Sequence, residues 1–245
     1  MKKKLALVLH GYPGPSLSIR EVENFLKTLR FDVIAPEYLQ RDKFEVENTA
    51  EWIKKNLGSR RPDLIVGLSL GGLVLPYVAK YYPQAKLVFI ATGEKVKSPF
   101  NWVNKIINLV DRPAGELIVK LLTLLPVSFL EIGYVIVQNV MNKKVDKKEL
   151  AKRRKEAAKA LQQLGADKHM EIIRFMKKCD NSEILRRLKN KTLIISGTSD
   201  TLMSTQRGRA LGLLLQNSKL TTVPGVHYNV VNRFSLEKIG KFIGE

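Results

Sequence analysis

Gly67-Leu68-Ser69-Leu70-Gly71 is the most informative stretch of this 245-residue chain. An apolar run, Asp63-Leu64-Ile65-Val66, leads into it, and a helix-like run over residues 72–79 follows. A strand, a sharp turn and a helix in this order present a serine hydroxyl at the edge of a sheet as a nucleophile. The glycines leave room for the tight turn, and the helix points the positive end of its dipole toward developing negative charge. We therefore predict that Ser69 is a nucleophile.

Around this turn, short β-branched apolar runs alternate with amphipathic stretches. Strands are expected at Leu5–Leu9, Phe31–Ala35, Leu64–Val66, Lys86–Thr92, Thr192–Ser196 and Lys219–Val223. Helices are expected at Ile19–Arg30, Val46–Asn56, Leu70–Tyr82, Gly208–Leu215 and Leu236–Ile243. Strands separated by helical patterns of this length are typical of parallel βαβ units. The pattern predicts an α/β protein with a mostly parallel, doubly wound sheet.

The segment from about Lys95 to Asn181 has a different character. It contains no convincing strand pattern and is expected to form four or five helices. Asp146 and Glu149 have the spacing of a helix start, and Gly165 is a suitable stop for that helix. We expect a helical cap inserted into the sheet domain, which divides the chain into a first core part (residues 1–95), the cap (96–182) and a second core part (183–245).

A serine hydroxyl needs a base, and the base needs a carboxylate that holds its tautomer. Of the three histidines, only His227 follows a late strand, where it can reach the sheet edge near Ser69. Asp200 follows the strand expected at Thr192–Ser196, and the order Ser, Asp, His is the one expected with a serine nucleophile in such a strand–turn–helix setting. Glu94, which follows an earlier strand, is the competing acid.

The tetrahedral intermediate of acyl transfer needs two main-chain donors for its oxyanion. One is expected to be the amide of Leu70, directly after the nucleophile. The other is expected from the glycine-containing loop at residues 10–14, where we assign it to the amide of Tyr12. His10 is expected to organise this loop by hydrogen bonding, not to take part in chemistry.

Several of these stretches together resemble the α/β-hydrolase superfamily over nearly the whole chain. They are LVLHGYPG at 7–14, FDVIAP at 31–36, GLSLGGL at 67–73, TLIISGTSD at 192–200 and PGVHY at 224–228. The resemblance implies an α/β-hydrolase fold with a helical cap, as in esterases, lipases, thioesterases and carbon–carbon bond hydrolases of this superfamily. A serine nucleophile argues against haloalkane dehalogenase chemistry, which uses aspartate at that position.

The function expected from these residues is a serine hydrolase of carboxylic esters, with apolar acyl or aryl esters favoured. Thioester or carbon–carbon bond hydrolysis on the same residues stays open, as does a ligand-binding protein with little turnover. No cofactor and no metal are expected, and Cys179 is the only cysteine. Apolar residues of the insert are expected to pack the cap on the core or to line an acyl pocket: Ile106, Ile107, Leu117, Leu121, Leu122, Leu124, Leu125, Phe129 and Ile132.

The chain carries a formal net charge of +19, with 42 Lys and Arg against 23 Asp and Glu. Residues 143–159 are rich in lysine and arginine, which is typical of a solvated helix face. Weak contact with an anionic membrane surface is the alternative. Aromatic residues make up only 7% of the chain, and no groove-reading or stacking motif supports nucleic-acid binding.

The apolar run after the basic N-terminus stops at His10, short of what a secretory signal needs. The apolar segment from Leu117 to Val140 is divided by Lys120, Pro126 and Glu131, so no membrane span is expected. We expect a cytoplasmic protein. The sequence leaves its oligomeric state open.

Overall fold

The computed structural model describes residues 3–41, 43–96, 108, 112–141 and 146–245. Its centre is a six-stranded sheet in the order β2-β1-β3-β4-β5-β6, in which every neighbouring pair is parallel. The strands are β1 (Leu5–Leu9), β2 (Asp32–Ile34), β3 (Leu64–Leu68), β4 (Lys86–Ile90), β5 (Thr192–Gly197) and β6 (Ser218–Val223). The predicted α/β class and parallel sheet are confirmed.

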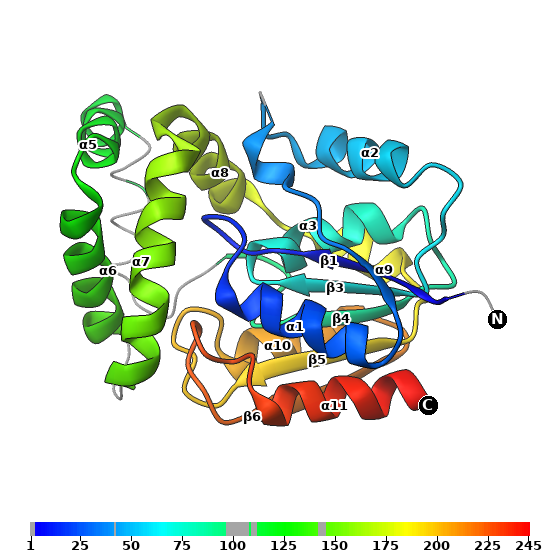
Figure 1. Ribbon diagram of the computed structural model, residues 1–245. Helices are drawn as coiled ribbons and strands as arrows, with labels where there is room; N and C mark the ends of the chain where they lie inside the picture. The colour runs from blue at the N-terminus through cyan, green and yellow to red at the C-terminus, as the bar shows by residue number, and fades with distance from the viewer. Residues whose placement is uncertain (1–2, 42, 97–107, 109–111, 142–145) are drawn as a thin grey trace.

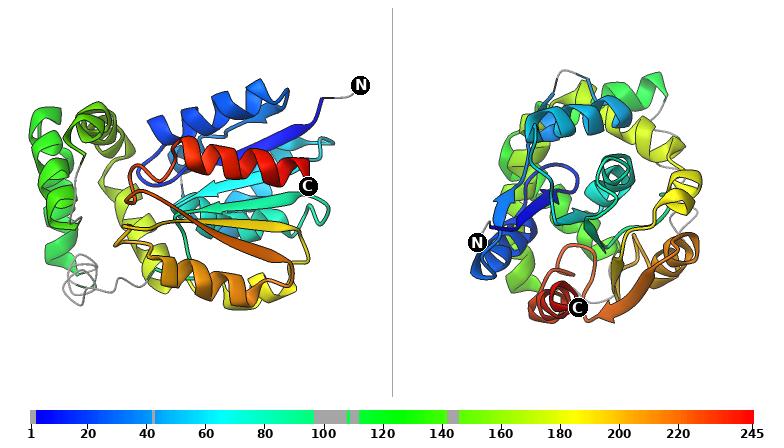
Figure 2. Two further views of the ribbon diagram at one scale, coloured as in Figure 1. Left: turned by 90° about the horizontal axis from the view of Figure 1, so that it is seen from below. Right: turned by 90° about the vertical axis from the view of Figure 1, so that its right-hand side faces the viewer.

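Helices cover both faces of this sheet (Figures 1 and 2). They are α1 (Leu17–Thr28) and α11 (Arg233–Gly244) on one face, and α2 (Val46–Leu57), α3 (Leu70–Ala79), α9 (Ser182–Arg187) and α10 (Thr205–Leu214) on the other. A short 3₁₀-helix, η1 (Tyr38–Gln40), follows β2. Helices α1, α2 and α11 turn an apolar stripe toward the sheet, and an amphipathic pattern predicted them. Helix α3 is buried on nearly all sides, and α9 was not predicted.

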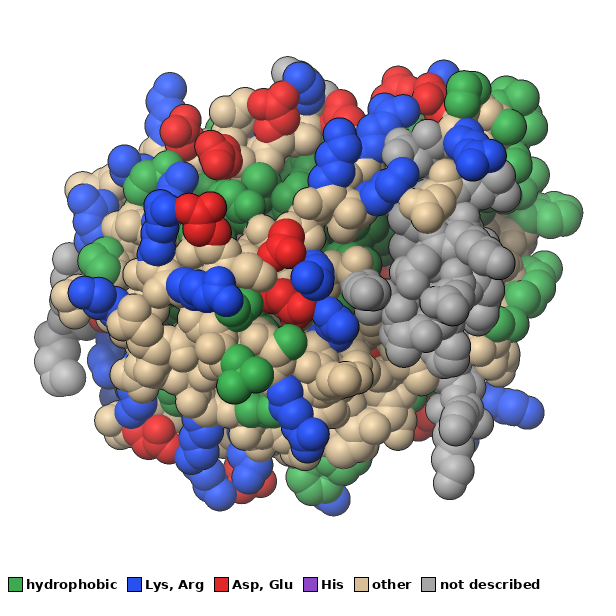
Figure 3. All heavy atoms as spheres, turned by 180° about the vertical axis from the view of Figure 1, so that it is seen from behind, with side chains coloured by type: hydrophobic (Ala, Val, Ile, Leu, Met, Phe, Trp, Pro, Cys, Tyr) green, Lys and Arg blue, Asp and Glu red, His purple; other side chains and the backbone are tan. Residues whose placement is uncertain are grey.

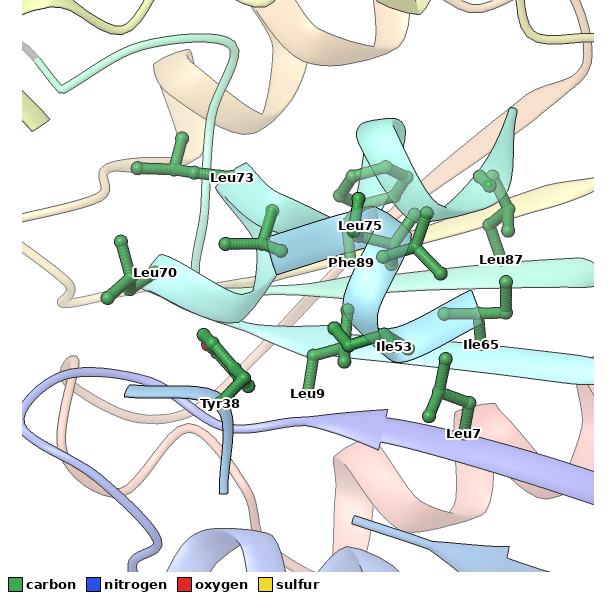
Figure 4. Packing of buried hydrophobic residues seen from close by; sticks show 14 of the residues in the cluster. Leu7, Leu9, Tyr38, Ile53, Ile65, Leu70, Leu73, Leu75, Leu87 and Phe89 are labelled. Carbon is green, nitrogen blue, oxygen red and sulfur yellow. The ribbon is translucent and has the colours of Figure 1, made fainter. Parts of the chain in front are cut away.

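The alternation of side chains along the strands builds two separate cores. In β1, Leu5, Leu7 and Leu9 belong to the core under α2 and α3, which Figure 4 shows from close by. Ala6 and Val8 point to the opposite face and pack with α1 and α11. Because both faces are buried, the strand is a continuous apolar run and not an alternating one.

Four described helices lie between β4 and α9 and form what we call the insert. They are α5 (Pro113–Thr123), α6 (Val127–Met141), α7 (Lys147–Leu164) and α8 (Ala166–Lys178). Asp146 caps α7 as expected, since its Oδ1 accepts from the amides of Lys148 at 3.0 Å and Glu149 at 3.1 Å. Gly165 ends α7 with a φ of 77°, a conformation that glycine adopts without strain.

The insert leaves the sheet domain and returns to it at the same place. Lys95 and Asp180 form an isolated antiparallel bridge, and their side chains form an ion pair of 3.2 Å. Asn181 donates its amide to the Glu94 carbonyl at 2.9 Å and its side-chain Nδ2 to the Leu73 carbonyl at 2.8 Å. These bonds fix the base of the insert beside α3.

The expectation that the apolar residues of the insert pack on the core or line a pocket is wrong for α5 and α6. Leu124 is 78% exposed and Phe129 60%, and other members of the set are also exposed: Leu117, Leu121, Leu122, Leu125 and Ile132. These helices cover α7 and α8 on the side away from the sheet, so their outer face meets solvent (Figure 1). Ile106, Ile107 and residues 143–145 of the basic run lie outside the described residues. Within the described ranges, no helix combines the length and the apolar character that crossing a bilayer demands.

Candidate active site

Ser69 occupies the sharp turn between β3 and α3. Its backbone has φ 53° and ψ −115°, a region that non-glycine residues rarely adopt and that is often found at functional sites. A Cβ at Gly67 would lie 2.6 Å from the Gly71 carbonyl oxygen, and one at Gly71 would lie 2.1 Å from the Leu9 carbonyl oxygen. Only glycine fits at either position. The predicted tight turn is therefore present, and the Ser69 amide ties it to β4 by donating to the Ile90 carbonyl at 2.9 Å.

Ser69, His227 and Asp200 form one continuous hydrogen-bonded chain. His227 Nδ1 lies 2.8 Å from Asp200 Oδ2, and its Nε2 lies 2.9 Å from Ser69 Oγ. A carboxylate can only accept, so Nδ1–H donates to it, and Nε2 is left to accept from the serine hydroxyl. The structure thus brings together the three side chains that the sequence singled out.

The Asp200 carboxylate is buried and held on both oxygens. Its side chain is 0% exposed, and Oδ1 accepts from the amides of Leu202 at 2.9 Å and Met203 at 2.8 Å. Oδ2 is thereby left to His227. Backbone bonds from the turn after β5 to the end of β6, including Ser199 N–H to the Gly225 carbonyl at 3.0 Å, hold the two loops together.

The environment of His227 acts on its basicity in two opposite directions. Burial lowers its pKa, but the charge of Asp200 and the hydrogen bond to it outweigh burial, so the pKa is raised above the ordinary 6.5. The side chain is 21% exposed. The imidazole is thus a stronger base than a free histidine and is placed on the serine hydroxyl.

Glu94, the competing acid, is engaged elsewhere. Its Oε1 accepts from Arg207 Nη1 at 2.8 Å, and the carboxylate is buried after β4. The carboxylate that contacts His227 belongs to Asp200. The alternative that Glu94 orients the histidine is therefore wrong. Asp200 reaches His227 because β5 and β6 are adjacent, so the loops that follow these two strands lie side by side.

The two expected oxyanion donors flank the serine. Leu70 is the first residue of α3, directly after Ser69. The loop that carries Tyr12 passes beside the same turn, since a Cβ built on Gly11 would lie 3.2 Å from the Ser69 Cβ. No acceptor in the described part of the chain takes the amide proton of Tyr12 or Leu70. That both serve an oxyanion stays a prediction.

His10 is buried behind this loop. Its Nδ1 donates to the Gly11 carbonyl at 2.9 Å, and its ring stacks on Tyr38 with centroids 4.4 Å apart. Tyr38 donates its hydroxyl to the His10 carbonyl. Burial lowers the pKa of His10 to about 4, so the ring is neutral near pH 7. These contacts fit the expected organising role.

A contact between Tyr12 and His169 escaped the sequence reasoning. Tyr12 Oη lies 2.6 Å from His169 Nδ1, and His169 Nε2 lies 2.7 Å from the Leu161 carbonyl. The carbonyl can only accept, so Nε2 carries the proton and Nδ1 accepts from the tyrosine hydroxyl. The bond joins the loop after β1 to α8 of the insert. The only signal in the sequence was that His169 is one of three histidines.

The comparisons with known proteins agree with this architecture. The family model described as "alpha/beta hydrolase fold" matches residues 6–232, and the chain belongs to that family. The comparison with curated proteins gave no match. Among the described residues, no group of three or more His, Cys, Asp or Glu side chains is arranged to hold a metal ion.

Solved structures resemble the chain over its full length at low sequence identity. A putative lipase from Acinetobacter baumannii AYE is 17% identical with a TM-score of 0.72, covering 98% of this chain and 83% of its own. A thermophilic esterase from Thermogutta terrifontis is 18% identical with a TM-score of 0.70, covering 99% and 90%. A bromoperoxidase from Bacillus anthracis is 17% identical with a TM-score of 0.76, covering 100% and 93%. These similarities establish the α/β-hydrolase fold.

Proposed function

We propose that this protein is a serine hydrolase that cleaves carboxylic esters through Ser69, His227 and Asp200. The observation that carries the proposal is the chain of hydrogen bonds of 2.9 and 2.8 Å from Ser69 Oγ through the imidazole to the buried carboxylate. The lipase and esterase among the structural neighbours are compatible with it. No cofactor takes part in the proposed reaction.

In the first half of the reaction, His227 Nε2 takes the hydroxyl proton while Ser69 Oγ attacks the acyl carbon. The carbonyl π pair moves onto oxygen, which the amides of Tyr12 and Leu70 stabilise. The C–O bond to the alcohol then breaks, and the imidazolium returns its proton to the leaving oxygen. The product of this half is an acyl group on Ser69 and a free alcohol.

In the second half, water replaces the alcohol. His227 takes a proton from the water as the water oxygen attacks the acyl carbon, and the same two amides hold the second oxyanion. The bond to Ser69 Oγ breaks, and Oγ recovers its proton from the imidazolium. Asp200 accepts from Nδ1–H throughout, which fixes the tautomer of the imidazole and stabilises the imidazolium.

We assign the insert as the cap of this site. Three contacts support the assignment, because each joins the insert or its first cap residue to a loop or a helix start that follows a strand of the sheet. The amide of Asp146 donates to Tyr228 Oη at 3.1 Å, one residue after His227, and His169 accepts from Tyr12. Arg153, buried on α7, donates to Ser18 Oγ at the start of α1.

The test uses a fluorophosphonate probe, which phosphonylates activated serines, together with p-nitrophenyl esters of increasing acyl length. We expect rapid labelling and ester hydrolysis by the wild-type protein. Ser69→Ala should lose labelling and lower kcat by at least about 10⁴-fold, because the nucleophile is removed. Rates with thioesters and with substrates of carbon–carbon bond hydrolases, measured in the same way, show which class of bond the protein cleaves fastest.

Ser128→Ala is the matched control, since Ser128 is an exposed serine on α6. It should label and turn over like the wild type. A folded wild-type protein that neither labels nor hydrolyses any ester of the series would overturn the proposal, and so would labelling that survives in Ser69→Ala.

A further inference from the structure

The outer face of α6 is apolar where a water-exposed helix is normally polar. Phe129, Ile132, Ile136 and Val140 follow one another at helical spacing, and they are 60%, 58%, 57% and 63% exposed. The only charged residue of the helix, Glu131, turns inward and pairs with Arg154 of α7 at 3.3 Å. The arrangement is thus inverted relative to a surface helix, whose apolar stripe faces the core.

The apolar face continues onto α5 and the turn that joins the two helices. Its further members are Leu117, Ile118, Leu121, Leu122, Leu124, Leu125 and Val137. Figure 3 shows hydrophobic side chains gathered along the edge of the molecule formed by these helices. We call this set, with the four residues of α6, the apolar face. A contiguous exposed patch of this kind marks an interaction site, whereas scattered apolar residues do not.

Positively charged side chains border the apolar face. Arg112, Lys120 and Arg174 share a hollow with Leu117, and Glu116 is the one carboxylate lining that hollow. At α6, Arg154 and its partner Glu131 line a second hollow together with Ile132 and Ile136. The adjacent helix α7 carries seven Lys and Arg residues against two Glu, and all of the seven except Arg153 are exposed. Apolar residues bordered by cations fit a surface that is negatively charged outside and apolar beneath.

From this geometry we infer that the apolar face docks on an anionic lipid bilayer, with α5 and α6 lying in the plane of the interface. The exposed leucines, isoleucines and phenylalanine enter the acyl boundary, while the surrounding Lys and Arg side chains remain at the headgroups. Both contributions act together, since apolar burial supplies the anchoring and the positive charge attracts the protein to anionic lipid.

The charge of the chain selects lipid over a second copy of the protein as the occupant. Each molecule carries a net charge of +19, so two copies that met through this face would repel each other. An anionic bilayer reverses the sign of that long-range interaction. The face also lies on the side of the insert away from the sheet, where a planar surface can approach it (Figure 1).

The experiment is flotation with vesicles of equal parts phosphatidylcholine and phosphatidylglycerol, both ether-linked so that ester hydrolysis cannot alter the surface. Wild-type protein should float with these vesicles at low salt. Binding should fall at high salt and on pure phosphatidylcholine, because the electrostatic attraction is screened or absent. The double variant Phe129→Asp/Ile136→Asp should bind at least about tenfold more weakly, since two anchoring side chains become charged.

Leu213→Asp is the matched control, because Leu213 is an 88% exposed leucine on α10, outside the apolar face. It should bind vesicles like the wild type, and the double variant should keep its circular dichroism spectrum and its hydrolysis of a short water-soluble ester. Absence of wild-type binding at low salt, or equal binding by the double variant, would overturn the inference. A wild-type protein that is dimeric, with a double variant that is monomeric, would also overturn the inference. The apolar face would then be a dimer interface. Binding is measured without turnover, so this outcome is independent of the proposed function.

Discussion

His227 sits between a carboxylate and a hydroxyl, and its raised pKa sets how activity should depend on pH. The imidazole must be neutral to accept the Ser69 proton. A raised pKa keeps the imidazole protonated, and therefore inactive, up to a higher pH. The acid limb of the pH profile, where kcat/KM falls as His227 is protonated, should therefore have its midpoint above pH 6.5. In Asp200→Asn the raising charge is gone and burial remains. We expect the limb to move to lower pH and kcat to fall by about 10⁴-fold, as the correct tautomer is lost.

Glu94→Gln is the control for this pH profile. Glu94 pairs with Arg207 and does not contact His227, so its loss should leave the position of the acid limb unchanged. If Glu94→Gln moved the limb and Asp200→Asn did not, the assignment of the acid would be wrong. Profiles of kcat/KM against pH for the three proteins decide the matter.

The candidate site was predictable to different degrees for different residues. Ser69 lies in a Gly-x-Ser-x-Gly turn between a strand and a helix, which can be recognised from the local sequence, so the pattern was sufficient. The choice between Asp200 and Glu94 was not local, because it depends on which strand lies beside β6. The partner of His169 is Tyr12, 157 residues away, and no short-range pattern connects them.

Among the elements, the loop after β1 and helix α8 are joined by the hydrogen bond between Tyr12 and His169. We expect this bond to hold the loop that carries the Tyr12 amide. In a double-mutant cycle of Tyr12→Phe and His169→Ala, the coupling free energy of unfolding should be about 1 kcal/mol, because each single variant leaves a buried polar partner unpaired. Tyr12→Phe should lower kcat more than it raises KM, since an oxyanion donor acts in the transition state.

Tyr81→Phe serves as the comparison in this cycle. Tyr81 is only partly buried and contacts lysines through its ring, which phenylalanine retains. It should show no coupling to His169. A coupling free energy near zero between Tyr12 and His169 would contradict the prediction that their bond holds the loop. A Tyr12→Phe variant in which only KM changes would contradict it as well. Urea unfolding and steady-state kinetics of the four proteins of the cycle provide both readouts.

The ends of helices were easier to predict than the surfaces they cover. Asp146 and Gly165 mark the limits of α7 through their own side chain and backbone, so the sequence was sufficient there. For α5 and α6 the pattern shows a run of apolar residues but does not say what lies against it. The expectation of a packed cap failed for that reason. Arg153, on a helix rich in exposed cations, is buried against Ser18 and Glu21, which depends on the docking of α7 on α1.

For the whole molecule, the net charge of +19 gives a prediction about stability. Unscreened charges of one sign repel each other most in the compact state. Sodium chloride shortens the Debye length from about 30 Å at 0.01 M to about 3 Å at 1 M. The Tm should therefore rise by several degrees over that range, as scanning calorimetry can measure. A Tm that is constant or falls would contradict it.

A variant with less charge tests the cause of this rise. Lys147, Lys148 and Lys155 are exposed on α7. Their joint replacement by Gln should reduce the increase in Tm with salt, because fewer like charges remain to be screened. An unchanged increase would attribute the effect to something other than self-repulsion.

The overall topology was predictable in class and not in detail. Alternating strands and helices determine a parallel sheet, because each crossover returns the chain in the same direction. The pairing of β4 with β5 across the insert follows from no local pattern. This pairing depends on a long-range contact, because Leu87 and Phe89 of β4 share one core with Ile194 of β5.

The position of the insert has a consequence for biosynthesis. When β4 has left the ribosome, about a hundred residues still have to be translated before β5 can pair with it, which takes about 5–20 s at ordinary elongation rates. During that time one edge of β4 has no neighbouring strand, and its free backbone groups can pair with a strand of another nascent chain. Chaperone demand during translation should thus depend more on the length of the insert than on the stability of the finished protein.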